Sequence, residues 1–110
     1  MSYKIIPTHR FEKELKRLAK KYPSLKIEFA ELISELSTNP EIGIFLGNNC
    51  YKIRLAIGSK GKGKSGGARV ITYLYIETDS VYLLTIYDKS EKVDLKSNEL
   101  NDIIESLELD

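Results

Sequence analysis

Apolar positions in the first forty residues recur at helical spacing. A short apolar stretch over 3–6, ended by Pro7, predicts a strand. Thr8 then has the residue type of a helix cap, and it precedes a stripe formed by Phe11, Leu15, Leu18 and Tyr22. After the break at Pro23, a second stripe predicts another helix, ended by 37–40: Leu25, Phe29, Leu32, Ile33 and Leu36. Two helices joined by so short a turn are expected to pair as a hairpin.

The second half of the chain changes to a period of two. Residues 51–57 alternate, so that Lys52, Arg54 and Ala56 face away from Ile53, Leu55 and Ile57. The glycine, serine and lysine residues of 58–67 predict a flexible loop without a packed side chain. β-branched and aromatic runs over 68–76 and 81–87, with a turn at 77–80, predict a β-hairpin. A polar stretch over 88–96 leads to a final acidic helix with Ser97 as its cap and these apolar positions: Leu100, Ile103, Ile104 and Leu107.

This order predicts one two-layer α+β domain over residues 1–110, with a short N-terminal strand, a helical hairpin, an antiparallel sheet of three or more strands and a C-terminal helix. A length of 110 residues leaves room for a single core. The apolar runs are too short to span a membrane, and the first residues lack a secretion signal, so we expect a cytoplasmic protein without a membrane partner. The single cysteine, Cys50, forms neither an internal disulfide nor a zinc site.

A formal net charge of +1 conceals strong segregation of charge along the chain. No acidic residue lies between Glu41 and Glu77, where six cations fall: Lys52, Arg54, Lys60, Lys62, Lys64 and Arg69. Lys52 and Arg54 share a strand face with Cα atoms about 6.5 Å apart. Arg69 begins the next predicted strand and Lys89 follows the third, so the four side chains are expected to converge on one surface. Such a surface predicts a polyanionic ligand.

Residues 58–65 match the phosphate-loop pattern G-x-x-x-x-G-K-[ST], but the mechanism of that loop requires a helix directly after it. Gly66, Gly67 and a strand pattern follow instead, so nucleotide hydrolysis is not expected. The basic segment also holds no pair of carboxylates, so we expect no metal ion and no cofactor. Among the seven tyrosines, Tyr87 at a predicted strand end is the best candidate for an accessible ring that stacks on a base.

Lysine, arginine and tyrosine suffice for one kind of phosphodiester cleavage. RNA carries its own nucleophile, the 2′-hydroxyl, and cations stabilise the charge that develops on the phosphorus oxygens in the transition state. A lysine can accept the hydroxyl proton where neighbouring cations weaken its hold on its own proton, and Lys52 beside Arg54 meets that condition.

Three stretches resemble the RelE/ParE superfamily of toxins from type II toxin–antitoxin pairs, and most closely its HigB-like branch: 51–55 (YKIRL), 60–69 (KGKGKSGGAR) and 82–89 (YLLTIYDK). The resemblance implies a RelE-like fold and a ribosome-dependent mRNA endonuclease that a small antitoxin silences, and we expect that antitoxin to be a helix-turn-helix protein. It implies that Lys52 and Arg54 act in proton transfer and phosphate contact, that Arg69 faces the scissile phosphate and that Lys89 assists charge stabilisation.

The expected RNA-binding residues are Lys60, Lys62, Lys64, Tyr87 and Lys92. The sequence departs from the members nearest to RelE at Leu95, where those carry a tyrosine, and Tyr87 is expected to take over its stacking role. Two other functions stay open on sequence alone. One is a ParE-like toxin that binds DNA gyrase without chemistry, and the other is a non-catalytic nucleic-acid-binding module.

Overall fold

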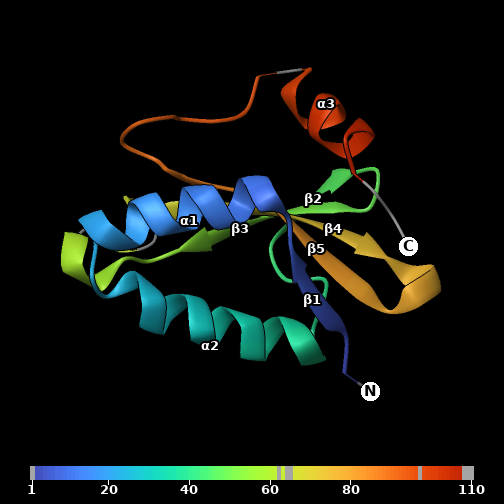
Figure 1. The fold of residues 1–110 in the computed structure, drawn as a ribbon, viewed down its shortest axis with the longest axis horizontal. Coiled ribbons are helices and arrows are strands. Elements are labelled where there is room, and N and C mark those ends of the chain that lie inside the picture. The colour runs from blue at the N-terminus through green and yellow to red at the C-terminus, as the bar shows by residue number, and fades with distance from the viewer. Residues whose placement is uncertain (1, 62, 64–65, 97, 108–110) are drawn as a thin grey trace.

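A computed structural model describes residues 2–61, 63, 66–96 and 98–107 (Figure 1). The helices are α1 (His9–Lys21), α2 (Leu25–Thr38) and α3 (Glu99–Glu105), and the strands are β1 (Lys4–Pro7), β2 (Ile44–Gly47), β3 (Cys50–Leu55), β4 (Ala68–Tyr75) and β5 (Ser80–Asp88). Short 3-10 turns lie at η1 (Gly58–Lys60) and η2 (Ile76–Thr78). The strands form one sheet in the order β1-β5-β4-β3-β2, confirming the α+β class. Only β1 among these strands pairs in parallel, with β5.

Helices α1 and α2 cover one face of the sheet. The Thr8 hydroxyl accepts a hydrogen bond from the Phe11 N–H, confirming it as the cap of α1. Phe11 and Leu18 of α1 and Leu25, Leu32 and Leu36 of α2 pack on a sheet face that includes these residues: Ile53, Val70, Leu74, Val81 and Leu83. The helical hairpin predicted from the two apolar stripes is therefore confirmed, and both stripes are core.

The opposite face of the sheet carries a smaller apolar cluster, which α3 covers in part. Cys50, Ile71, Leu84 and Tyr87 lie buried there against Ile103 of α3, with Leu95, Leu100, Ile104 and Leu107 around them. The segment between β5 and α3 runs in a long arch from the end of β5 to α3 (Figure 1). The predicted cap of this helix, Ser97, lies outside the described residues. None of the described helices is long and apolar enough to cross a bilayer.

Strand β2 was missing from the sequence prediction. It pairs with β3 through a two-residue turn at Asn48 and Asn49, which have φ angles of 51° and 61°. Positive φ at both central residues is the geometry that matches the twist of paired strands, and asparagine tolerates it better than most residues. The apolar run 44–46 before the turn is the signal that could have identified the strand.

Candidate functional site

Three adjacent strands bring the predicted cations to one end of the sheet. Arg54 of β3 lies opposite Arg69 of β4, and Arg69 lies opposite Tyr87 of β5, so these three residues form one row across the sheet. Paired strands are about 4.8 Å apart, and like charges directly opposite each other repel. Lys52 lies two residues along β3 on the same face. An anion bound by this row would offset that repulsion.

Lys89 extends this row just beyond the end of β5. Its N–H donates to the Gly67 carbonyl at 3.0 Å, which continues the β4–β5 ladder by one residue. Among the described residues, neither the Lys89 nor the Arg54 side chain makes a hydrogen bond or ion pair, and Arg54 is exposed. The structure therefore brings Lys52, Arg54, Arg69 and Lys89 to one face and one end of the sheet, and we call these four residues the cationic row.

Arg69 is the least accessible of the four cations. It is only 4% exposed, and its Nη1 donates to the Ala68 carbonyl at 3.1 Å. A buried guanidinium held in place by its surroundings keeps its orientation before any anion binds. The row thus combines a buried arginine at its centre with more accessible cations around it.

The prediction that Tyr87 offers an accessible ring is wrong. Tyr87 is 6% exposed, because the segment after β5 folds over it. Its hydroxyl donates to Asp94 Oδ1 at 3.3 Å, and the Lys92 ammonium lies 5.7 Å from the ring centre. Burial, together with the negative charge of Asp94, raises the pKa of Tyr87 to about 12. The phenol is therefore a neutral hydrogen-bond donor at physiological pH.

Asp94 is the site residue that the sequence reasoning missed. Its Oδ2 lies 3.3 Å from Lys52 Nζ while its Oδ1 accepts from Tyr87, so one carboxylate joins two of the predicted site residues. Burial opposes its ionisation, but hydrogen bonds from Leu95 N–H, Lys52 and Tyr87 outweigh that effect and lower the pKa of Asp94. No local signal marks this residue, because the contact with Lys52 spans 42 positions of the chain.

Lys92 is already paired within the molecule. Its ammonium contacts the Glu99 carboxylate, which also accepts from Arg10 at 3.2 Å. The hydrogen bond from Lys92 is the main reason that the pKa of Glu99 falls to about 2. Lys92 thereby ties the segment after β5 to the start of α3, and any contact with RNA would have to compete with Glu99.

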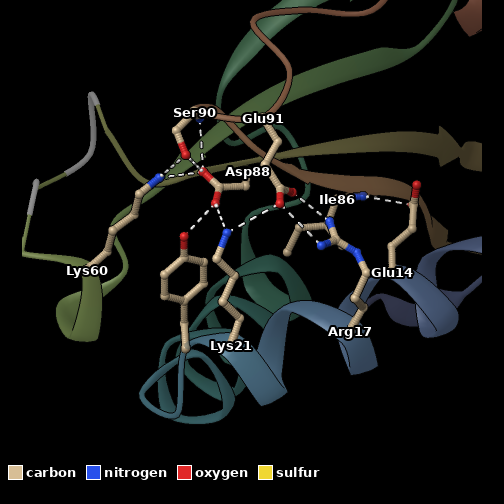
Figure 2. Close-up of polar contacts among 9 residues, drawn as sticks. Glu14, Arg17, Lys21, Lys60, Ile86, Asp88, Ser90 and Glu91 are labelled. Atoms are coloured by element: carbon tan, nitrogen blue, oxygen red, sulfur yellow. Dashed lines mark hydrogen bonds and ion pairs between the residues drawn. The ribbon is translucent and has the colours of Figure 1, made fainter.

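Lys60 lies on the other side of the sheet from the cationic row. Its ammonium contacts the buried Asp88 carboxylate and lies 2.9 Å from Ser90 Oγ, and its side chain is 8% exposed (Figure 2). The prediction that 58–67 contains no packed side chain is therefore wrong at Lys60, because a fully buried carboxylate draws that ammonium inward. The other two predicted loop cations, Lys62 and Lys64, lie outside the described residues.

On the opposite face of the sheet from the cations, several donors surround the buried carboxylate of Asp88. Tyr22 donates to it at 2.6 Å, and the Ser90 N–H and hydroxyl donate at 2.9 and 2.8 Å. Burial opposes ionisation, yet the hydrogen bonds from Lys60, Tyr22 and Ser90 hold the pKa of Asp88 well below its ordinary value. Next to this cluster, Glu91 accepts from Arg17 at 2.7 Å and from Lys21 at 3.3 Å (Figure 2). These contacts fix the end of β5, where Tyr87 and Lys89 flank Asp88 in sequence.

The geometry of 58–67 does not support a phosphate loop. The 3-10 turn η1 ends at Lys60, and the next regular element is strand β4 rather than a helix. No group of three or more histidine, cysteine, aspartate or glutamate side chains able to hold a metal ion occurs among the described residues. A hollow of about 740 Å³ lies beneath α3, but it lies away from the cationic row and is lined in part by Ile6, Leu84, Ile103 and Leu107.

Comparison with known proteins identifies the family. The family model described as the RelE toxin of the RelE/RelB toxin–antitoxin system matches residues 7–106. The free form of the Escherichia coli toxin RelE, carrying two arginine-to-alanine substitutions, superposes with a TM-score of 0.66 at 18% identity, covering 98% of this chain and 100% of that one.

Two antitoxin complexes show the same fold. RelE in the intact E. coli RelBE complex gives a TM-score of 0.60 at 20% identity, over 79% of this chain and 96% of that chain. The Mycobacterium tuberculosis RelBE2 complex gives 0.54 at 16% identity, over 80% and 99%. None of these comparisons bears on the HigB-like branch, which stays a prediction. With a family match over nearly its whole length and the same fold in solved RelE structures, this chain belongs to the RelE family of toxins from toxin–antitoxin systems.

Proposed function

We propose that this protein is a ribosome-dependent mRNA endonuclease that needs no metal ion and inhibits translation. The observation that carries the proposal is the row of Arg54 and Arg69 in register, with Lys52 and Lys89 beside it on the same face. A binding surface without chemistry needs positive charge, but it does not need one cation held rigidly at the centre of others. A fixed centre of that kind suits a single phosphorus whose charge grows during a reaction.

In the proposed reaction the substrate 2′-oxygen attacks the adjacent phosphorus, and the bond from phosphorus to the 5′-oxygen breaks. The 2′-hydroxyl loses its proton and the departing 5′-oxygen gains one, so the products are a 2′,3′-cyclic phosphate and a free 5′-hydroxyl. Arg69, with Arg54, stabilises the oxygens of the pentacoordinate phosphorus, and Lys89 stabilises charge on the same group. Lys52 is positioned to contact the phosphate and to take part in proton transfer. Tyr87, which is protonated at physiological pH, serves as a hydrogen-bond donor and not as a base.

The proposed partners are the ribosome with its mRNA and a cognate antitoxin, a small helix-turn-helix protein. Two of the structurally similar proteins are toxins in complex with an antitoxin or an antitoxin peptide, namely E. coli RelE with RelB and with a RelB peptide. An antitoxin of this chain is expected to supply acidic groups, because the surface that it must silence is cationic.

The proposal is tested by Arg69→Ala and Arg54→Ala, with Lys20→Ala as the matched control on the exposed surface of α1. mRNA 5′ ends are mapped on ribosomes after induced expression, and growth is followed in parallel. We expect Arg69→Ala to lower the cleavage rate by about 10²–10³-fold, as the loss of one preorganised charge-stabilising group does. Arg54→Ala is expected to lower it less, because Arg54 is exposed, and Lys20→Ala is expected to leave it unchanged.

Cleavage that survives Arg69→Ala in a folded protein would overturn the proposed site. Arg69→Lys separates charge from packing, since it keeps a cation at this buried position. A supercoiling assay with purified gyrase runs beside the ribosome experiment. Inhibition of gyrase without any new mRNA 5′ ends would replace the endonuclease proposal with a ParE-like function, and RNA binding without either effect would indicate a non-catalytic module.

A further inference from the structure

A carboxylate from outside the sheet contacts Lys52, one of the predicted site cations. Asp94 belongs to the segment 89–96 that arches from the end of β5 toward α3 (Figure 1). Its two oxygens are divided between two donors, with Oδ2 3.3 Å from Lys52 Nζ and Oδ1 3.3 Å from Tyr87 Oη. Asp94 therefore bridges the lysine of β3 and the tyrosine of β5.

A carboxylate and a phosphodiester present the same features to such donors. Each is a monoanion with two oxygens that accept charge-assisted hydrogen bonds, and each attracts cations that face it. The Lys52 ammonium and the Tyr87 hydroxyl are both donors, and Arg69 lies between Arg54 and Tyr87 in the row. The donors that hold Asp94 are thus also suited to hold an RNA phosphate beside Arg69 and Arg54.

We propose that Asp94 occupies the position of a substrate phosphate, so that RNA must displace this carboxylate from Lys52 and Tyr87 before it can bind. This inference rests on the proposed function and adds to it an internal anion that competes with the substrate. Displacement frees the Tyr87 hydroxyl to donate to the phosphate in place of Asp94. It also releases the Lys52 ammonium from Asp94, so that the ammonium can contact the phosphate.

The structure makes such a displacement easy. The Asp94 side chain is 57% exposed, and exposed ion pairs contribute little to stability because water competes for both charges. The segment nevertheless stays tethered on both sides of Asp94, through Lys92 to Glu99 and through Leu95 to the apolar cluster under α3. A displaced Asp94 therefore remains close and returns when the substrate leaves.

The decisive variant is Asp94→Asn, because it removes the charge while it keeps the size of the side chain and one accepting oxygen. Its amide oxygen can still accept from the Leu95 N–H, which donates to Oδ1 at 2.8 Å, and from Tyr87. Glu91→Gln is the matched control, since it removes one negative charge from the same segment at a residue that contacts Arg17 and Lys21 instead. Thermal unfolding of each variant establishes that the fold is kept.

Binding is measured to a short single-stranded 2′-O-methyl oligoribonucleotide, which lacks the nucleophile and cannot be cleaved. We expect Asp94→Asn to bind it roughly three- to tenfold more tightly than the natural chain, with the gain shrinking at high salt. The change in the logarithm of the affinity should be less than half as large for Glu91→Gln as for Asp94→Asn. In a Lys52→Ala background the gain from Asp94→Asn should disappear, because the two residues act as one pair.

Equal or weaker binding by folded Asp94→Asn would overturn the inference, as would an equal gain in Glu91→Gln. Failure of the endonuclease proposal looks different. In that case Asp94→Asn binds the oligonucleotide more tightly, yet neither it nor the natural chain produces new mRNA 5′ ends on ribosomes. Conversely, cleavage by the natural chain together with unchanged binding by Asp94→Asn leaves the endonuclease in place and removes Asp94 from the phosphate position.

Discussion

At the scale of single residues, the position of a side chain along β5 decides what it does. Tyr87 and Asp88 are neighbours in sequence and both are buried, but alternation along the strand sends them to opposite faces. Tyr87 lies on the face of the cationic row, whereas Asp88 lies on the other face and accepts hydrogen bonds from Lys60, Tyr22 and Ser90. The carboxylate of Asp88 thus fixes the strand end that presents Tyr87 and Lys89.

Asp88→Asn is expected to lower the free energy of unfolding at pH 7 by about 3 kcal/mol, because it leaves the buried Lys60 ammonium without its counter-charge. The pKa of Asp88 is lower in the folded state than in the unfolded chain, so its contribution to stability is complete above about pH 4 and is lost as the pH falls. Urea unfolding at several pH values should show a flatter acid limb for the variant. Glu91→Gln, at a more exposed acid nearby, is the control and should cost much less.

At the scale of elements, close contact between β3 and β4 sets the spacing of the cations. Gly67 directly precedes β4, and a Cβ atom there would lie 2.2 Å from the carbonyl oxygen of Leu55. The next residue pairs along the ladder are Leu55 with Ala68 and Arg54 with Arg69. Any side chain at position 67 must therefore push the two strands apart beside the arginine row.

Gly67→Ala is expected to destabilise the protein by about 1–3 kcal/mol, the usual range for overpacking. Cleavage should fall further than this loss of folded protein explains, because the Arg54–Arg69 spacing changes. Gly58→Ala is the control, since a Cβ atom there meets chiefly the flexible end of Glu28 at 3.1 Å. Urea unfolding and mRNA cleavage on ribosomes are measured for both variants. Equal effects of the two substitutions would contradict this account.

At the scale of the whole molecule, opposite charges are sorted onto different parts of the surface although the net charge is only +1. The cations at the ends of β3, β4 and β5 face one way, whereas Glu99, Asp102 and Glu105 lie on α3. A polyanion approaching this molecule therefore meets a local positive field that the net charge does not reveal.

The logarithm of the association constant for the 2′-O-methyl oligonucleotide is accordingly expected to fall linearly with the logarithm of the salt concentration. Loss of one phosphate contact in Arg54→Ala should reduce the magnitude of that slope by about 0.7, the value for a single strand. Lys20→Ala, on α1, should leave the slope unchanged. Titrations at four or more salt concentrations measure both slopes, and equal slopes for the two variants would show that Arg54 touches no phosphate.

Local patterns predicted much of this fold and little of the finer geometry of the site. The helical hairpin and the strands around Arg54, Arg69 and Tyr87 follow from periodicity, which depends only on neighbours in sequence. The burial of Tyr87, the inward turn of Lys60 and the bridge made by Asp94 depend on segments that are far apart in the chain. No spacing rule reports such contacts, because tertiary packing alone determines them.

The parallel pairing of β1 with β5 has a consequence for synthesis of the chain. Thr8, just after β1, donates its hydroxyl to the carbonyl of Leu83, 75 positions later. While the polypeptide is being made, β1 leaves the exit tunnel long before its partner exists, and the arginine row is equally incomplete. The sheet can therefore close only after β5 has emerged, so the strand ends that carry Arg54, Arg69 and Lys89 come together only late in synthesis.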